Sequence, residues 1–132
     1  MLVDDDQTTN FLNQLLLKKL AITDQILVAQ DGQAALELLE QHCMTLTSTC
    51  PSLILLDVNM PGMNGIQFLE AFQQLSIAQQ HTIIIVMLTT SLHPRDVERV
   101  QQLHINGFLN KPLTREKIND LLRTHFQSEL PS

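Results

Sequence analysis

The sequence has few of the features that mark nucleic-acid binding or membrane insertion. Its 132 residues include only eight Lys and Arg, which are scattered, against fourteen Asp and Glu. The resulting net charge of −6 is the opposite of a basic footprint for DNA or RNA. The longest apolar run, Ile83 to Leu88, is far too short to span a bilayer. We therefore expect a protein that binds neither nucleic acid directly nor a membrane.

Cysteine is also scarce, and the first residues do not form an apolar signal segment. The two cysteines, Cys43 and Cys50, lack the C-x-x-C spacing of metal and redox sites. The short segment between them could be closed by a disulfide. Because nothing else in the sequence is typical of a secreted protein, we expect two unpaired thiols and a cytoplasmic location.

No linker rich in Gly, Ser or Pro divides the chain, and no internal repeat is visible. Hydrophobic residues make up 44% of the sequence, which is ordinary for a folded domain. Few residues follow Phe126, and most of them are polar. We expect a single domain over residues 1–132 with no output domain.

Short apolar runs alternate with amphipathic segments along the whole chain. The runs, which suit strands buried on both faces, cover residues 1–3, 26–29, 53–56, 83–88 and 107–109. The amphipathic segments predict helices over 9–20, 33–41, 66–75, 94–103 and 114–126. In the first of these segments, Phe11, Leu12, Leu15, Leu16 and Leu20 recur at helical spacing. With right-handed crossovers, this order predicts an α/β fold, a five-stranded doubly wound parallel sheet with five helices.

Polar residues follow four of the five predicted strands. Asp4 and Asp5 follow the first strand and Asp57 the third, while Thr89 follows the fourth and Lys111 the fifth. In open parallel sheets, ligands bind outside the carboxyl ends of the strands. The sequence therefore predicts that three carboxylates, a hydroxyl and an amine meet at one edge of the sheet.

This combination of groups suits phosphoryl transfer. Three neighbouring carboxylates repel one another and need a cation, and oxygen ligands favour Mg²⁺. A carboxylate can attack phosphorus to give an aspartyl-phosphate. A Lys ammonium and a Thr hydroxyl can then position and neutralise the phosphoryl oxygens. Because no obvious general base accompanies them, we expect a lasting phosphorylated state.

Four blocks of residues also carry a family resemblance. They are Val3 to Asp6, Leu55 to Gly65 (LLDVNMPGMNG), Met87 to Ser91 (MLTTS) and Gly107 to Leu113 (GFLNKPL). Together, in this order and at this spacing, they resemble a response-regulator receiver domain of two-component signalling. The resemblance covers nearly the whole chain and implies a flavodoxin-like fold. The family's strand order, 2-1-3-4-5, is carried over with it.

The resemblance implies roles for the residues at the strand ends. Asp57 would accept a phosphoryl group from a histidine kinase or a phosphotransfer protein. Asp5 would bind Mg²⁺ directly, Asp4 would reach it through water or assist, and Asp57 would belong to the same metal site. Asn59 would give the metal its backbone carbonyl. Such a domain assists its own phosphorylation and dephosphorylation and is not otherwise an enzyme. Independently of the resemblance, Asp6 is expected to begin the first helix, because negative charge is favoured there.

The resemblance also implies a switch. Thr89 and Lys111 would contact the phosphoryl group, and Phe108 would change rotamer together with Thr89. The surface formed by residues 94–103, 107–109 and 114–126 would then change its affinity for a downstream effector protein. The Lys111–Pro112 peptide bond would be cis, a form that only an X-Pro bond adopts at low cost.

Two alternatives from other functional classes compete with this interpretation. Asp4 to Thr8 also fits the D-x-D-x-T pattern of haloacid-dehalogenase phosphatases, in which the first Asp is the nucleophile. Such an enzyme needs another acidic metal motif after Lys111, where only Glu116, Asp120 and Glu129 remain. A flavin-binding flavodoxin-like module would need a hydroxyl- and glycine-rich phosphate loop after the first strand, where a row of Asp would repel phosphate.

Overall fold

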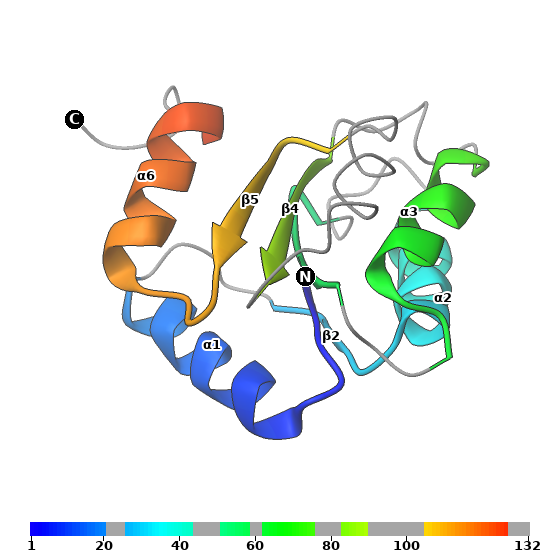
Figure 1. Cartoon of the computed structure of the whole chain (residues 1–132), viewed down its shortest axis with the longest axis horizontal. Helices are drawn as coiled ribbons and strands as arrows, with labels where there is room; N and C mark the ends of the chain where they lie inside the picture. Colours follow the sequence, from blue (N-terminus) through cyan, green and yellow to red (C-terminus); the bar gives the residue numbers. More distant parts are fainter. Residues whose placement is uncertain (21–25, 44–50, 59–61, 76–82, 90–104, 127–132) are drawn as a thin grey trace.

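The structure is a computed structural model that describes residues 1–20, 26–43, 51–58, 62–75, 83–89 and 105–126 (Figure 1). Its strands are β1 (Leu2–Val3), β2 (Val28–Ala29), β3 (Leu53–Asp57), β4 (Ile84–Thr89) and β5 (Gly107–Asn110). Its helices are α1 (Gln7–Lys19), α2 (Gly32–Cys43), α3 (Gly65–Gln73) and α6 (Arg115–Phe126). The helix predicted over 94–103 lies outside the described residues.

The five strands form one parallel sheet in the order β2-β1-β3-β4-β5, which confirms the predicted flavodoxin-like fold. The register aligns Leu2 with Leu55, Leu55 with Val86, and Val86 with Gly107. Central strands of such a sheet have both faces covered, which explains why β3 and β4 are continuous apolar runs.

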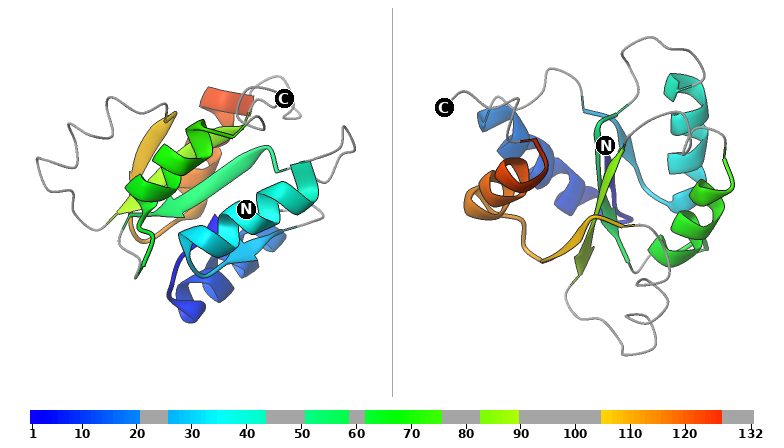
Figure 2. Two further views of the ribbon diagram at one scale, coloured as in Figure 1. Left: turned by 90° about the vertical axis from the view of Figure 1, so that its right-hand side faces the viewer. Right: turned by 90° about the horizontal axis from the view of Figure 1, so that it is seen from above.

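Helices cover both faces of the sheet: α1 and α6 lie on one side, α2 and α3 on the other (Figure 2). Because side chains alternate along a strand, β3 contributes to two cores. Ile54 and Leu56 pack on the α2–α3 side with Leu39 and Phe68. Leu55 packs on the α1–α6 side, where Ile118 of α6 is fully buried.

Helix α1 forms where the sequence predicts it, but only part of its apolar stripe is buried. Phe11 and Leu12 are 58% and 56% exposed, and Leu15 is exposed as well. The buried residues are Asn10, Asn13 and Leu17, three and four positions apart. Of the predicted apolar residues, Leu16 and Leu20 are partly buried and pack on the α1–α6 core, whereas the other three face outward. The apolar spacing therefore predicted the helix correctly, but only part of the apolar stripe faces the core. Asn10 contributes to this orientation through a buried hydrogen bond from its side chain to the Asp4 carbonyl.

The cysteines also differ from the expectation. Cys43 is fully buried at the end of α2 and is disulfide-bonded, so the prediction of unpaired thiols was wrong. Its partner lies outside the described residues.

Among the helices that the structure describes, we find none with the length and apolar character needed to cross a membrane.

Candidate functional site

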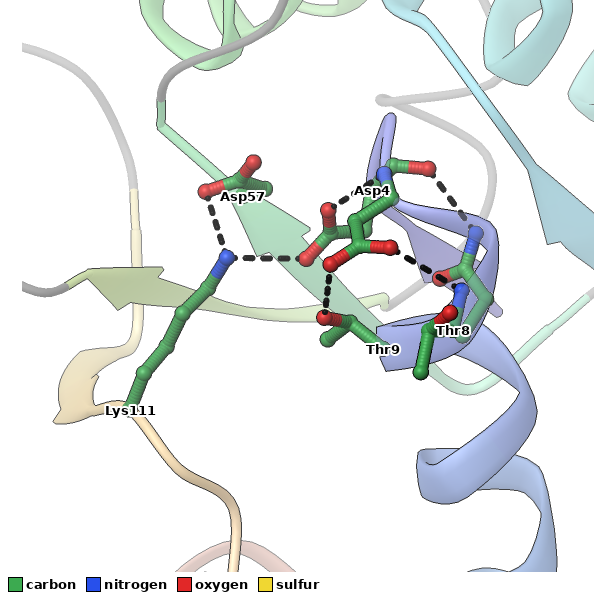
Figure 3. Close-up of polar contacts among 7 residues, drawn as sticks. Asp4, Thr8, Thr9, Asp57 and Lys111 are labelled. Atoms are coloured by element: carbon green, nitrogen blue, oxygen red, sulfur yellow. Dashed lines mark hydrogen bonds and ion pairs between the residues drawn. The ribbon is translucent and has the colours of Figure 1, made fainter.

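Asp4, Asp57 and Lys111 meet at the carboxyl edge of the sheet, as predicted. Asp4 directly follows β1, Asp57 is the last residue of β3, and Lys111 directly follows β5. The Lys111 side chain extends across the edge, with its ammonium between the two carboxylates (Figure 3). Its Nζ lies 2.9 Å from Asp4 Oδ2 and 3.1 Å from Asp57 Oδ1. The side chain of Thr89, at the end of β4, and all of Asn59 lie outside the described part of the structure.

Asp5 completes an acidic cluster with Asp4 and Asp57. One carboxylate oxygen from each residue lies within 4.8 Å of the others. Asp4 and Asp57 are only 3% and 5% exposed, whereas Asp5 is exposed. Together with the Lys111 ammonium, these three carboxylates carry a net charge of −2. A divalent cation with oxygen ligands matches that charge and the donor atoms.

The two carboxylates also hold Lys111 in its charged form. Burial by itself would lower the pKa of the ammonium. Hydrogen bonds to Asp4 and Asp57, together with their charges, outweigh burial and raise the pKa of Lys111 above its ordinary value. Lys111 therefore stays protonated through the physiological range and presents a fixed positive charge beside Asp57.

The backbone around Asp4 is fixed from several directions. The Asp6 amide donates to Asp4 Oδ1 at 2.9 Å, so both Asp4 carboxylate oxygens have a partner. Asn10 Nδ2 donates to the Asp4 carbonyl at 2.8 Å in a buried hydrogen bond. The Asp4 amide donates to the Ala29 carbonyl at 3.1 Å. These contacts leave Asp5 as the exposed carboxylate of the cluster.

Asp6 has a different task from its two neighbours. It is the N-cap of α1 and accepts hydrogen bonds from the Thr9 hydroxyl at 2.9 Å and the Thr8 amide at 3.0 Å (Figure 3). These bonds, the Thr9 one foremost, lower the pKa of Asp6. The helix-start role predicted for Asp6 is confirmed. A D-x-D pair acting together is not assembled, because Asp4 binds Lys111 while Asp6 caps the helix.

Asp57 is positioned by the turn that leads into α3. Asn64 is the N-cap of α3 and forms a reciprocal capping box with Gln67. The Gly65 amide donates to the Val58 carbonyl at 2.9 Å. A Cβ atom at Gly65 would lie 2.5 Å from the Asp57 carbonyl oxygen. The helix therefore approaches the backbone of Asp57 more closely than a side chain permits.

Replacing Gly65 by Ala should displace the backbone of Asp57. We expect Gly65→Ala to lower the free energy of unfolding by about 1–3 kcal/mol, because backbone atoms must shift to accept the methyl group. Urea titration measures this change. Gly107→Ala is the matched control, since nothing lies within 4 Å of a Cβ atom at Gly107. Equal stability of the Gly65 and Gly107 variants would contradict the close approach.

Phe108 lies on β5, where it pairs in register with Met87. Its side chain is 40% exposed, whereas Val86 and Met87 of the neighbouring strand are buried. Because the Thr89 side chain is not among those described, the coupled movement of Thr89 and Phe108 stays a prediction. The predicted cis peptide bond between Lys111 and Pro112 is confirmed.

The sequence interpretation missed Asn10. Its side chain is 4% exposed, and its Oδ1 atom has no hydrogen-bond partner among the described residues. A signal was present, since Asn10, Asn13 and Leu17 follow helical spacing just as the leucines do. The hydrogen bond from Asn10 to the Asp4 carbonyl could not be read from the pattern of apolar residues.

Comparisons with known proteins agree with this geometry. The family model described as "Response regulator receiver domain" matches residues 1–123. Response regulator Rcp1 of Synechocystis is 35% identical over 84% of this chain and 74% of its own length. The probable chemotaxis protein CheY of Rhizobium etli is 33% identical over 96% and 90% of the two chains. A two-component response regulator from Cytophaga hutchinsonii has a similar structure, with a TM-score of 0.81 and 30% identity over 96% and 94% of the chains.

Proposed function

This chain belongs to the response regulator receiver family and is a phosphoacceptor signalling domain, and we propose that Asp57 is the residue that accepts the phosphoryl group. One observation carries this proposal. The Asp57 carboxylate is nearly buried at the end of β3, 3.1 Å from the Lys111 ammonium and within a cluster of oxygens suited to a metal ion.

In the proposed reaction, a carboxylate oxygen of Asp57 attacks the phosphorus atom of the donor. A bond forms between that oxygen and phosphorus, and the bond from phosphorus to the donor's leaving group breaks. When the donor is a phosphohistidine whose other ring nitrogen carries a proton, the electron pair stays on the imidazole nitrogen and the imidazole leaves as a neutral group. The charge of Asp57 moves onto the phosphoryl oxygens and grows to about −2. Lys111 already lies where that charge develops, so little rearrangement is needed for it to act.

The residues present fit Mg²⁺. Asp5 and Asp57 would bind it with the backbone carbonyl of Asn59, and Asp4 would assist through water, because both of its carboxylate oxygens already have partners. Bound there, the ion neutralises phosphoryl oxygens. The same arrangement lets the domain assist both its own phosphorylation and its own dephosphorylation.

In the proposed switch, phosphorylation shifts the protein between two conformations that offer different surfaces to an effector. The Thr89 hydroxyl would move toward the phosphoryl group, and Phe108 would turn into the space that it leaves. The half-exposed Phe108 supports this, since it is in a position from which an inward turn would bury more apolar surface. The face formed by residues 94–103, β5 and α6 would then bind an effector protein with a different affinity.

Response regulators receive phosphate from a donor protein and act on an effector, and an exposed stripe on α1 supports a docking surface for the donor. Phe11, Leu12 and Leu15 form an exposed apolar stripe on α1. The helix begins at Asp6, next to the acidic cluster. Exposed apolar patches often mark interaction sites. A histidine kinase or phosphotransfer protein that docks on this stripe in the cytoplasm would bring its phosphohistidine to Asp57.

Incubation with acetyl phosphate tests the proposal without a partner protein. In the presence of Mg²⁺, intact-protein mass spectrometry should show the gain of one phosphoryl group. A chelator should prevent that gain, because Mg²⁺ neutralises the transferring group. Leu12→Ala changes the exposed stripe on α1 but not the site. Because acetyl phosphate needs no docking surface, this variant should be phosphorylated at the rate of the unmodified protein. Phosphorylation that is equally fast in the chelator would contradict the proposed metal role.

A further inference from the structure

Lys117, in the first turn of α6, forms hydrogen bonds with the backbone of the loop that carries Lys111. Its Nζ donates hydrogen bonds to the Asn110 carbonyl at 2.6 Å and to the Pro112 carbonyl at 2.8 Å. These two residues flank Lys111 in the chain. A single ammonium therefore ties together the backbone on both sides of the lysine in the site.

The position of Lys117 is itself fixed. Its amide donates to Thr114 Oγ1 at 3.2 Å, and the next amide, that of Ile118, donates to the Thr114 carbonyl at 3.0 Å. The Ile118 side chain is fully buried in the core between α6 and the sheet. The backbone of Lys117 thus belongs to a helix that is packed on the core, and its side chain reaches from that helix to the loop.

Lysine is an electrostatically unfavourable residue at this position of a helix. A cation in the first turn of a helix is disfavoured by the helix dipole, which favours acidic residues there. The two carbonyl oxygens give the ammonium partners that compensate for this. One of them belongs to Asn110, the last residue of β5, which pairs in register with Thr89 at the end of β4. The contact is therefore made at the carboxyl ends of the strands, where the residues of the site lie.

We propose that Lys117 is a positioning residue, which holds the 110–112 backbone so that the Lys111 ammonium reaches Asp4 and Asp57. It touches neither carboxylate, and acts only through the loop. The inference rests on the proposed function, because it assigns Lys117 a part in the phosphorylation of Asp57.

The test compares Lys117→Met with two matched variants. Lys117→Arg keeps a cationic donor, and Arg123→Met removes a charge from an exposed position of the same helix. A small displacement of a catalytic group can slow a reaction by up to about a hundredfold, so we expect Lys117→Met to slow phosphorylation by acetyl phosphate about tenfold. Lys117→Arg should restore most of the rate, and Arg123→Met should match the unmodified protein. Unfolding midpoints confirm that each variant folds.

A double-mutant cycle with Lys111→Met separates positioning from a general structural effect. If Lys117 acts through Lys111, then adding Lys117→Met to Lys111→Met should cause little further loss of rate. A further tenfold loss in that background, or an unchanged rate in Lys117→Met alone, would overturn the inference.

A second readout does not depend on phosphorylation. In NMR spectra, the amide shifts of Asp4 and Asp57 should move in Lys117→Met and stay in place in Lys117→Arg. Unmoved shifts in both variants would overturn the positioning role. If the unmodified protein takes no phosphoryl group at all, the proposed function fails, and the shifts still decide whether Lys117 positions Lys111.

Discussion

Asp57→Asn is expected to reduce phosphorylation by acetyl phosphate at least about a thousandfold, which corresponds to ~4 kcal/mol of activation free energy. The amide has nearly the same shape as the carboxylate, but it is a poor nucleophile toward phosphorus and does not form the acyl phosphate. The variant should fold normally. It removes one of three clustered negative charges while Lys111 keeps Asp4 as a partner at 2.9 Å. In the absence of Mg²⁺ its unfolding midpoint should therefore equal or exceed that of the unmodified protein.

Asp120→Asn is the matched control, because it makes the same chemical change at an exposed position of α6. Its phosphorylation rate should not change. Initial rates from intact-protein mass spectrometry measure both variants. Retention of normal phosphorylation by Asp57→Asn would remove Asp57 from the role of acceptor. A loss of rate accompanied by unfolding would show instead that Asp57 is needed for the fold.

The second large effect is expected for Lys111→Met. Removing one preorganised donor from a site of developing negative charge slows a reaction by about a hundredfold to a thousandfold, and we expect a loss in this range. The methionine keeps most of the aliphatic chain, so the change falls mainly on the charge. The Nζ contacts to Asp4 and Asp57, at 2.9 and 3.1 Å, are the interactions that disappear.

Lys111→Met should also weaken the fold when no metal is bound. The two nearly buried carboxylates lose their shared cation, and we expect the free energy of unfolding to fall by about 1–3 kcal/mol. Urea titrations with and without Mg²⁺ measure this, and Mg²⁺ should recover much of the loss. Because the pKa of Lys111 is raised, its contribution in the unmodified protein is fully present below the ordinary lysine pKa and is lost as pH rises through the raised value. Stability that is unchanged by the substitution would contradict the ion pairs.

Much of the site could be predicted because it depends on strand ends. Asp4, Asp57 and Lys111 each follow an apolar run, and parallel topology brings such residues to one edge whatever the details of packing. The sheet order came with the family resemblance, and Asp6 was identified as a helix start from its type and place. These features depend on local sequence and on topology, both of which the printed sequence carries.

The features that were missed depend on contacts between side chains and distant or turned backbone. Asn10 faces inward and binds the Asp4 carbonyl, whereas Phe11 and Leu12 face outward although their spacing suits a core. Lys117 reads in the sequence as an ordinary surface lysine. Its two carbonyl partners become visible only when the loop after β5 is folded back on α6.

Mapping the phosphorylated residue tests the central claim most directly. The protein is incubated with Mg²⁺ and acetyl phosphate, the acyl phosphate is reduced with borohydride, and the modified aspartate is located by peptide mass spectrometry. We expect modification of Asp57, with Asp4 and Asp5 unmodified. Modification of Asp4 with Asp57 intact would contradict it and would favour the nucleophile of a haloacid-dehalogenase phosphatase.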